Sequence, residues 1–309
     1  MLRNEKALAR EDFKKLVSLL PDSAHAHFLY ANALARSGQK ARARKEIERA
    51  VDVDATYLPG RIGEVKMFVQ HNKLNEAKAA MEKVKEDFGD IPPVLALDGW
   101  LALGLGDYSR AEKSLSAANE QIPSSEIALL LFRSLWLQGE HEQAYAVLNT
   151  RLEQKPNELA LLEELAAAKL AQGKKTEALD AYHSVVEDHP DHVLALNNLA
   201  WLSRDQDLDQ AIAYAAHAQQ LAPEAAGVAD TLAMLLLQKD SDSKRGFKLL
   251  EKSSKQAPAN LEIQLHYATV LAQRKMYTQA RAVLNTVVKS APNSAMAIEA
   301  TERLEALPH

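Results

Sequence analysis

The stretch AHAHFLYANALARSGQKARARKEIERAVDVDA, residues 24–55, decides the fold. Apolar residues recur at helical spacing on both sides of Gly38, which interrupts the pattern. The stretch therefore predicts two short amphipathic helices joined by a tight turn. Small residues at Ala31 and Ala43 let the two backbones approach closely, whereas Ile47 fills the gap toward the neighbouring unit.

The same unit recurs along the whole chain at a step near 34 residues. Prolines stand at most of the unit ends, with Ala55 and Gly89 at the two remaining ones: Pro21, Pro123, Pro156, Pro190, Pro223, Pro258 and Pro292. A small residue stands twelve positions before each end: Ala9, Ala43, Ala77, Ala111, Ala144, Ala178, Ala211, Gly246 and Ala280. We interpret each proline as the start of the next helix, where its missing N–H is harmless. The period predicts a solenoid of helix pairs.

This period and its small-residue positions resemble the tetratricopeptide repeat family over essentially all 309 residues. The resemblance implies an all-α fold, an α-solenoid that forms a right-handed superhelix of helix-turn-helix repeats. Placing the template on the sequence predicts that the first helices of eight pairs start near these residues: Ala24, Leu58, Pro92, Ser125, Leu159, Val193, Ala226 and Leu261.

We expect a single array over 1–309, since no linker or low-complexity tract interrupts the period. Residues 1–23 are interpreted as the second helix of a half-repeat, 24–293 as eight repeats, and 294–309 as a terminal helix that begins with a Ser cap. Because an array more often opens with a whole helix pair, we expect Met1 to mark a truncation; a degenerate natural cap is the alternative.

Composition narrows the classes of partner. A net charge of −5 without a basic stripe argues against nucleic acid. No apolar run reaches the length of about 18 residues that a membrane span needs. The chain has no cysteine, which excludes disulfides and thiol chemistry. We predict no cofactor and no transmembrane segment.

Signatures of catalysis are absent from the sequence, including HExxH, a Walker-type loop, GxGxxG after a strand, and GxSxG. We predict that the chain is not an enzyme. The best metal-like cluster is EDHPDH at 187–192, which could hold a divalent ion loosely. A solvated turn is the alternative, and no second ligand pair follows at a fixed spacing, so no metal is predicted.

The resemblance implies that the first helix of each pair lines a concave groove and that ligand contacts come from fixed positions of each repeat. Those positions hold the predicted partner-binding residues: Phe28, Asn32, Arg36, Lys66, Trp100, Arg133, Trp136, Asn197, Trp201, Arg204 and Asp230. The same face holds further positions: His25, Ile62, Glu163, Met234, His266 and Thr269. All three tryptophans fall on this face, and Trp and Arg are frequent anchors of binding surfaces. Packing in the repeat core is the alternative interpretation.

Residues 190–307 are also similar to the C-terminal repeats of bacterial lipoproteins that accompany exopolysaccharide and PEP-CTERM sorting loci, through LNNLAWL at 196–202, QAIAYAAHAQQLAP, ADTLAMLLLQ and RGFKLLEKSSKQAP. That similarity implies an envelope scaffold facing the periplasm; a cytoplasmic location is the alternative for an untruncated chain.

The leading hypothesis is a non-catalytic scaffold that binds a peptide or partner protein in the groove. Two alternatives are a regulatory domain of a larger polypeptide and self-association through the array ends. The half-repeat would expose an apolar strip for such self-association: Leu8, Phe13, Leu16 and Leu20.

Overall fold

The computed structural model describes residues 2–308, with side chains from Arg10 onward, and folds this part of the chain into eighteen helices without a strand. Its backbone contacts divide the chain into two compact units, one ending at Gln154 and the other beginning at Lys155. Each unit is described by itself. The single array over 1–309 stays a prediction.

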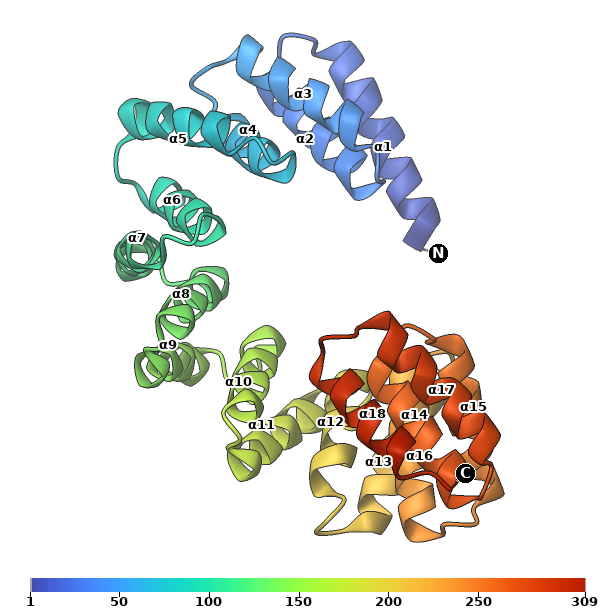
Figure 1. The fold of residues 1–309 in the computed structure, drawn as a ribbon. Helices are drawn as coiled ribbons and strands as arrows, with labels where there is room; N and C mark the ends of the chain where they lie inside the picture. The colour runs from blue at the N-terminus through green and yellow to red at the C-terminus, as the bar shows by residue number, and fades with distance from the viewer. Residues whose placement is uncertain (1, 309) are drawn as a thin grey trace. The chain divides into compact units, whose positions relative to one another are not determined.

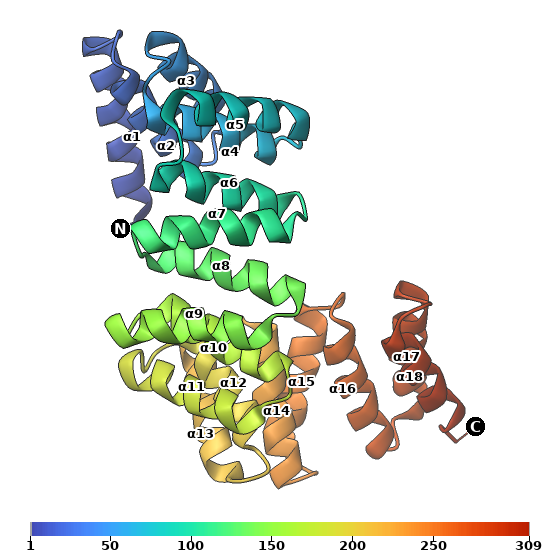
Figure 2. The same ribbon diagram turned by 90° about the vertical axis from the view of Figure 1, so that its left-hand side faces the viewer.

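The first unit consists of α1 and four helix pairs (Figure 1): α1 Leu2–Leu19, α2 Ala24–Arg36, α3 Lys40–Val53, α4 Leu58–Gln70, α5 Leu74–Phe88, α6 Pro92–Gly104, α7 Tyr108–Gln121, α8 Ser125–Gln138 and α9 His141–Gln154. The second unit consists of four pairs and a last helix (Figure 2): α10 Leu159–Ala171, α11 Lys175–Asp188, α12 Val193–Ser203, α13 Leu208–Leu221, α14 Ala226–Lys239, α15 Lys244–Gln256, α16 Leu261–Gln273, α17 Tyr277–Ser290 and α18 Ala295–Glu305.

The first helix of every pair begins at the residue that the repeat template predicts, from Ala24 in α2 to Leu261 in α16. The predicted Ser cap of the last helix is also confirmed, because the Ser294 hydroxyl accepts a hydrogen bond from the Ala297 N–H at 3.1 Å. The eight helix pairs, with α1 and α18 at their ends, form an all-α repeat solenoid.

The interpretation of the prolines at the unit ends as helix starts is wrong. Pro21 lies three residues before α2, at the second position of a β-turn that the Ser23 N–H closes on the Leu20 carbonyl at 3.2 Å. A fixed φ near −65° suits that turn position, which explains why proline recurs there. Five further prolines at unit ends lie at the same position of a hydrogen-bonded β-turn: Pro156, Pro190, Pro223, Pro258 and Pro292.

In six of the eight pairs, the turn between the two helices contains a residue with a left-handed backbone conformation at the end of the first helix. Gly38 takes this position after α2 with φ 77°, and Gly139 after α8 with φ 86°. Two repeats place a residue with a side chain there instead, Asn72 with φ 58° and Lys275 with φ 63°. The geometry of the turn is therefore retained where glycine is lost, at some conformational cost.

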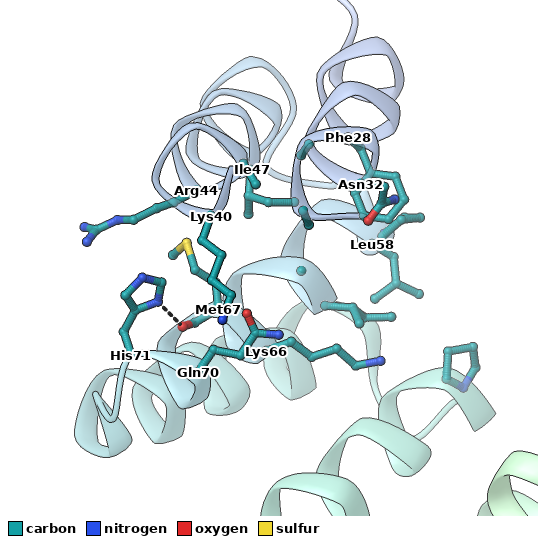
Figure 3. A pocket seen from close by; sticks show the side chains of 17 residues that line it. Phe28, Asn32, Lys40, Arg44, Ile47, Leu58, Lys66, Met67, Gln70 and His71 are labelled. Carbon is teal, nitrogen blue, oxygen red and sulfur yellow. Dashed lines mark hydrogen bonds between the residues drawn. The ribbon is translucent and has the colours of Figure 1, made fainter. Parts of the chain in front are cut away.

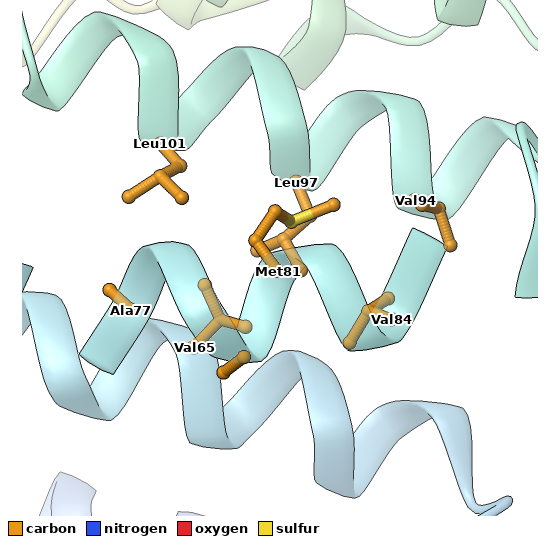
Figure 4. Close-up of a cluster of buried hydrophobic side chains, with 8 residues drawn as sticks. Val65, Ala77, Met81, Val84, Val94, Leu97 and Leu101 are labelled. Atoms are coloured by element: carbon orange, nitrogen blue, oxygen red, sulfur yellow. The ribbon is translucent and has the colours of Figure 1, made fainter. Parts of the chain in front are cut away.

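The small residues that stand twelve positions before each unit end pack where the helices of a pair cross. Ala77 is fully buried on α5, beside Met81 and Val84 of the same helix (Figure 4). The cluster also includes Ala80 of α5, Val65 of α4 and three residues of α6: Val94, Leu97 and Leu101. The core therefore runs from one repeat into the next as a continuous layer.

Helix α1 covers the start of the array. Phe13 and Val17 pack against Tyr30, Leu34 and Ala43 of the first pair. Two residues of the predicted apolar strip, Phe13 and Leu16, are half-buried, whereas Leu20 is 51% exposed. The side chain of Leu8 lies outside the described residues.

Candidate functional site: the inner face of the first unit

Each first helix of the first unit contacts the first helix of the following pair, α2 with α4, α4 with α6, and α6 with α8. Among the described residues, no two second helices contact each other to a comparable extent. The first helices therefore share one face, and positions on that face belong to a common surface.

A cavity of about 460 Å³ opens on this surface between the first pair and α4 (Figure 3). Apolar side chains form most of its wall, among them Phe28 of α2, Ile47 of α3, and Leu58 and Met67 of α4. Gly63 lets the Ile47 side chain pack directly against α4, since a Cβ there would lie 2.8 Å from the Ile47 Cδ1. A concave, mostly apolar wall of this kind can receive an apolar side chain of another molecule.

A second cavity of about 400 Å³ adjoins the first and lies along α4, α6 and α8. The two cavities share Ile62, Lys66 and Pro93 in their walls. Trp100 lines the second cavity and packs on the core cluster below it, and the Lys66 Nζ lies 5.8 Å from the centre of its ring. We call the two adjoining cavities, with the residues that line them, the inner groove.

The structure brings four of the predicted groove residues of the first unit together in the inner groove: Phe28, Asn32, Lys66 and Trp100. Arg36 is exposed at the end of α2 and lines neither cavity, and neither does Arg133 of α8.

Trp136 lies in a different environment. Its ring stacks on Phe132 at 5.5 Å and lies 4.3 Å from the His141 ring and 5.9 Å from the Tyr145 ring. His141 and Tyr145 belong to α9, so Trp136 packs between the two helices of its own pair. This contact fits the alternative interpretation, core packing.

Two cations of the inner groove were missed by sequence reasoning. Lys40 and Arg44 line the first cavity from the start of α3, a second helix, whereas the repeat template counts groove positions on first helices only. The basic run KARARK at 40–45 is the sequence signal that would have found them.

The predicted residues of the second unit form a separate cluster. The Arg204 guanidinium lies 3.9 Å from the centre of the Trp201 ring, and that ring lies 6.4 Å from the ring of His266. The His266 Nδ1 is hydrogen-bonded to the Asp230 Oδ2 at 2.8 Å. Asp230 is only 7% exposed, so it acts here as the partner of His266 inside the unit.

The cluster also shifts the pKa of the His266 imidazole. Burial would lower the pKa of His266, but the hydrogen bond and the negative charge of Asp230 outweigh it and raise that pKa above its ordinary value. Glu262 acts in the same direction, and Arg303 opposes it. The Asn197 side chain lies half-buried on α12, with its Oδ1 unpaired.

A second buried acid, Asp98 of α6, is fully engaged in holding helices together. It accepts hydrogen bonds from Arg110, from the Ser114 hydroxyl at 2.6 Å, and from the Lys85 ammonium at 2.9 Å. Burial alone would raise the pKa of Asp98, but these three donors lower it. The carboxylate joins α5, α6 and α7, and this role is structural.

The EDHPDH segment is engaged in local contacts. The His192 Nδ1 accepts the Ala195 N–H and caps α12, while its Nε2 lies 2.9 Å from a Glu163 carboxylate oxygen. Asp191 pairs with His217 at 3.0 Å. Among the side chains that the structure describes, from Arg10 to Pro308, no group of three or more His, Asp or Glu is placed to hold a metal ion. Over residues 2–308, no helix has both the length and the apolar character needed to cross a bilayer.

Two family models, both described as tetratricopeptide repeat, match most of the chain. One matches residues 102–169 and 241–304, and the other matches residues 3–57 and 164–226. The chain belongs to the tetratricopeptide repeat family. Proteins with this fold commonly serve as scaffolds for protein–protein interaction and are generally non-catalytic. A search of curated proteins found no match.

Solved tetratricopeptide repeat structures share the fold. The APC/C hetero-tetramer Cut9–Hcn1 superposes with a TM-score of 0.57 at 15% identity, covering 98% of this chain and 59% of that chain. The C-terminal part of a repeat protein from Cytophaga hutchinsonii gives 0.58 at 12% identity and covers 77% of this chain and 98% of that one. PilF of Pseudomonas aeruginosa gives 0.52 at 16% identity, with coverages of 74% and 99%. The chain therefore spans less than two thirds of the first of these proteins.

Proposed function

We propose that this protein is a non-catalytic scaffold whose inner groove binds a segment of a partner protein. The observation that carries the proposal is the pair of adjoining cavities, walled by Phe28, Leu58, Ile62 and Trp100, on the face shared by the first helices. Apolar hollows beside a few polar side chains are the usual form of a recognition site. Bulky side chains of the partner would fill the hollows and supply most of the affinity.

The proposal is tested by blocking the groove without touching the core. Asn32 is exposed on α2 and lines the first cavity, so Asn32→Trp is expected to fill the cavity and leave the fold intact. Asn75→Trp on α5 is the matched control, since Asn75 is also exposed and lines neither cavity. A random phage-displayed peptide library is panned against the wild-type protein, and the most enriched peptide is synthesised with a fluorescent label.

Fluorescence anisotropy then gives the affinity of that peptide for each variant. We expect Asn32→Trp to weaken binding by about tenfold or more and Asn75→Trp to leave it unchanged. Equal binding by both variants, or no enrichment of any peptide, would show that the inner groove is not the binding surface.

Residues 190–307 are similar to envelope lipoproteins. This similarity supports a location of the protein in the bacterial envelope and a role in exopolysaccharide assembly. Fractionation of source cells that express a tagged protein tests this location. Recovery in the cytoplasmic fraction alone would contradict it.

Association through the array ends is a second candidate, favoured by exposed apolar side chains on the terminal helices. Leu19 is 76% exposed on α1, and Ile298 is 59% exposed on α18. Light scattering over a range of protein concentrations decides between the candidates, because a mass that stays monomeric at every concentration excludes association.

A further inference from the structure

The first cavity of the inner groove carries positive charge in a protein whose net charge is −5. Three cationic side chains line it, Lys40, Arg44 and Lys66, and none of its lining residues is Asp or Glu. Apolar walls around these cations lower the local dielectric, which strengthens their attraction for an anionic group.

Two of these cations are available to a partner. The Arg44 guanidinium is already paired with Glu48 at 2.7 Å. Lys40 and Lys66 are exposed, and neither forms an ion pair with any residue that the structure describes. Lys66 stands where the two cavities meet, beside the ring of Trp100. A carboxylate held there would lie next to an apolar anchor.

The far end of the groove has the opposite charge. Glu126, in the first turn of α8, is exposed and lines the second cavity, which includes no cation other than the shared Lys66. The inner groove is thus positive where α3 and α4 line it and becomes negative toward α8. A bound segment with carboxylates at one end would have one favoured placement.

From this charge gradient we infer that the inner groove recognises a protein segment that combines bulky apolar side chains with Asp or Glu residues. The carboxylates lie over Lys40 and Lys66, and the part without acidic residues lies over Trp100 and Glu126. This inference rests on the proposed function, because it names the chemistry of the partner that occupies the same groove. Charges at the rim of a recognition surface mainly set selectivity and association rate, so the inference concerns which segments bind.

The test reverses single charges in the full chain. Lys40→Glu and Lys66→Glu remove attraction at the positive end, and Glu126→Lys removes repulsion at the other end. Lys78→Glu is the matched control, since Lys78 is exposed on α5 and lines neither cavity. The probes are the most enriched library peptide, a form with its acidic residues changed to amides, and a form with additional Glu residues throughout.

We expect the enriched peptides to contain more Asp and Glu than the starting library. Each Lys→Glu change should weaken binding of the enriched peptide by about fivefold, while Lys78→Glu stays within about twofold. Glu126→Lys should strengthen binding of the Glu-rich form by about threefold, a gain that an unfolded variant cannot give. High salt should weaken the binding of the acidic peptide and leave the binding of the amide form unchanged.

The outcomes separate the inference from the proposed function. If peptides bind in a way that Asn32→Trp abolishes but the charge reversals leave unchanged, the groove stands and the charge inference is wrong. If binding is insensitive to Asn32→Trp, or no peptide is enriched, both fail. Equal affinity for the acidic and amide forms also overturns the inference.

Discussion

At the scale of single residues, tryptophans that the sequence predicts on one face of the repeats lie in different environments. Trp100 lines the inner groove, whereas Trp136 packs against two rings of α9. We expect Trp136→Ala to lower the free energy of unfolding by about 2–4 kcal/mol, because it leaves a cavity among packed rings. Leu137→Ala is the control, since Leu137 is 54% exposed and should change stability by less than about 0.5 kcal/mol. Urea unfolding measures both, and equal effects would place Trp136 outside the core.

The His266–Asp230 pair predicts a pH dependence of stability. The pKa of His266 is raised in the folded protein, so the pair stabilises fully below the ordinary value of 6.5 and is lost as the pH rises through the folded pKa. We expect Asp230→Asn to cost about 1.5 kcal/mol in mildly acidic solution and less at alkaline pH. Urea unfolding across this pH range measures the difference, with His266 titrated by NMR. A cost that does not shrink as the pH rises would contradict the prediction.

At the scale of the helix pair, a substitution at Gly246 tests why a small residue stands twelve positions before each unit end. A Cβ at Gly246 would lie 2.9 Å from the Leu237 Cγ and 3.1 Å from the Ala233 carbonyl oxygen, so α14 and α15 would have to separate. We expect Gly246→Ala to destabilise by about 1–3 kcal/mol. Gly227→Ala on α14 meets no atom within 4 Å and should be neutral or stabilising by up to about 1 kcal/mol. Thermal melts compare the two, and a stabilising Gly246→Ala would show that the pair has room to spare.

The elements could be predicted closely because each repeat restates the same local rules. Helix starts such as Ala24 and Leu261 follow from the period alone, since caps, turns and apolar spacing recur with it. The prolines at the unit ends correctly indicated where the turns lie. Their interpretation as helix starts was wrong, because a fixed φ suits both a helix start and a β-turn. The hydrogen bond from Ser23 to Leu20 decides between them.

The inner groove could be predicted only in part. Phe28 and Trp100 follow from repeat positions, but Lys40 and Arg44 reach the same cavity from a second helix. Their placement in this cavity depends on how the first pair packs against α4. Sequence spacing within one repeat does not carry that information.

At the scale of the whole molecule, contacts between helices are local in sequence. Within each unit, helices contact the next helix or the next but one, and each unit has its own buried core. In such arrays stability is close to a sum of repeat and neighbour terms, so each unit is expected to fold by itself. Residues 1–154 and 155–309, expressed separately, should each unfold cooperatively, and their far-UV circular dichroism should add up to that of the intact chain within about a tenth. A fragment that is unfolded alone would show instead that the two units fold only as one continuous array.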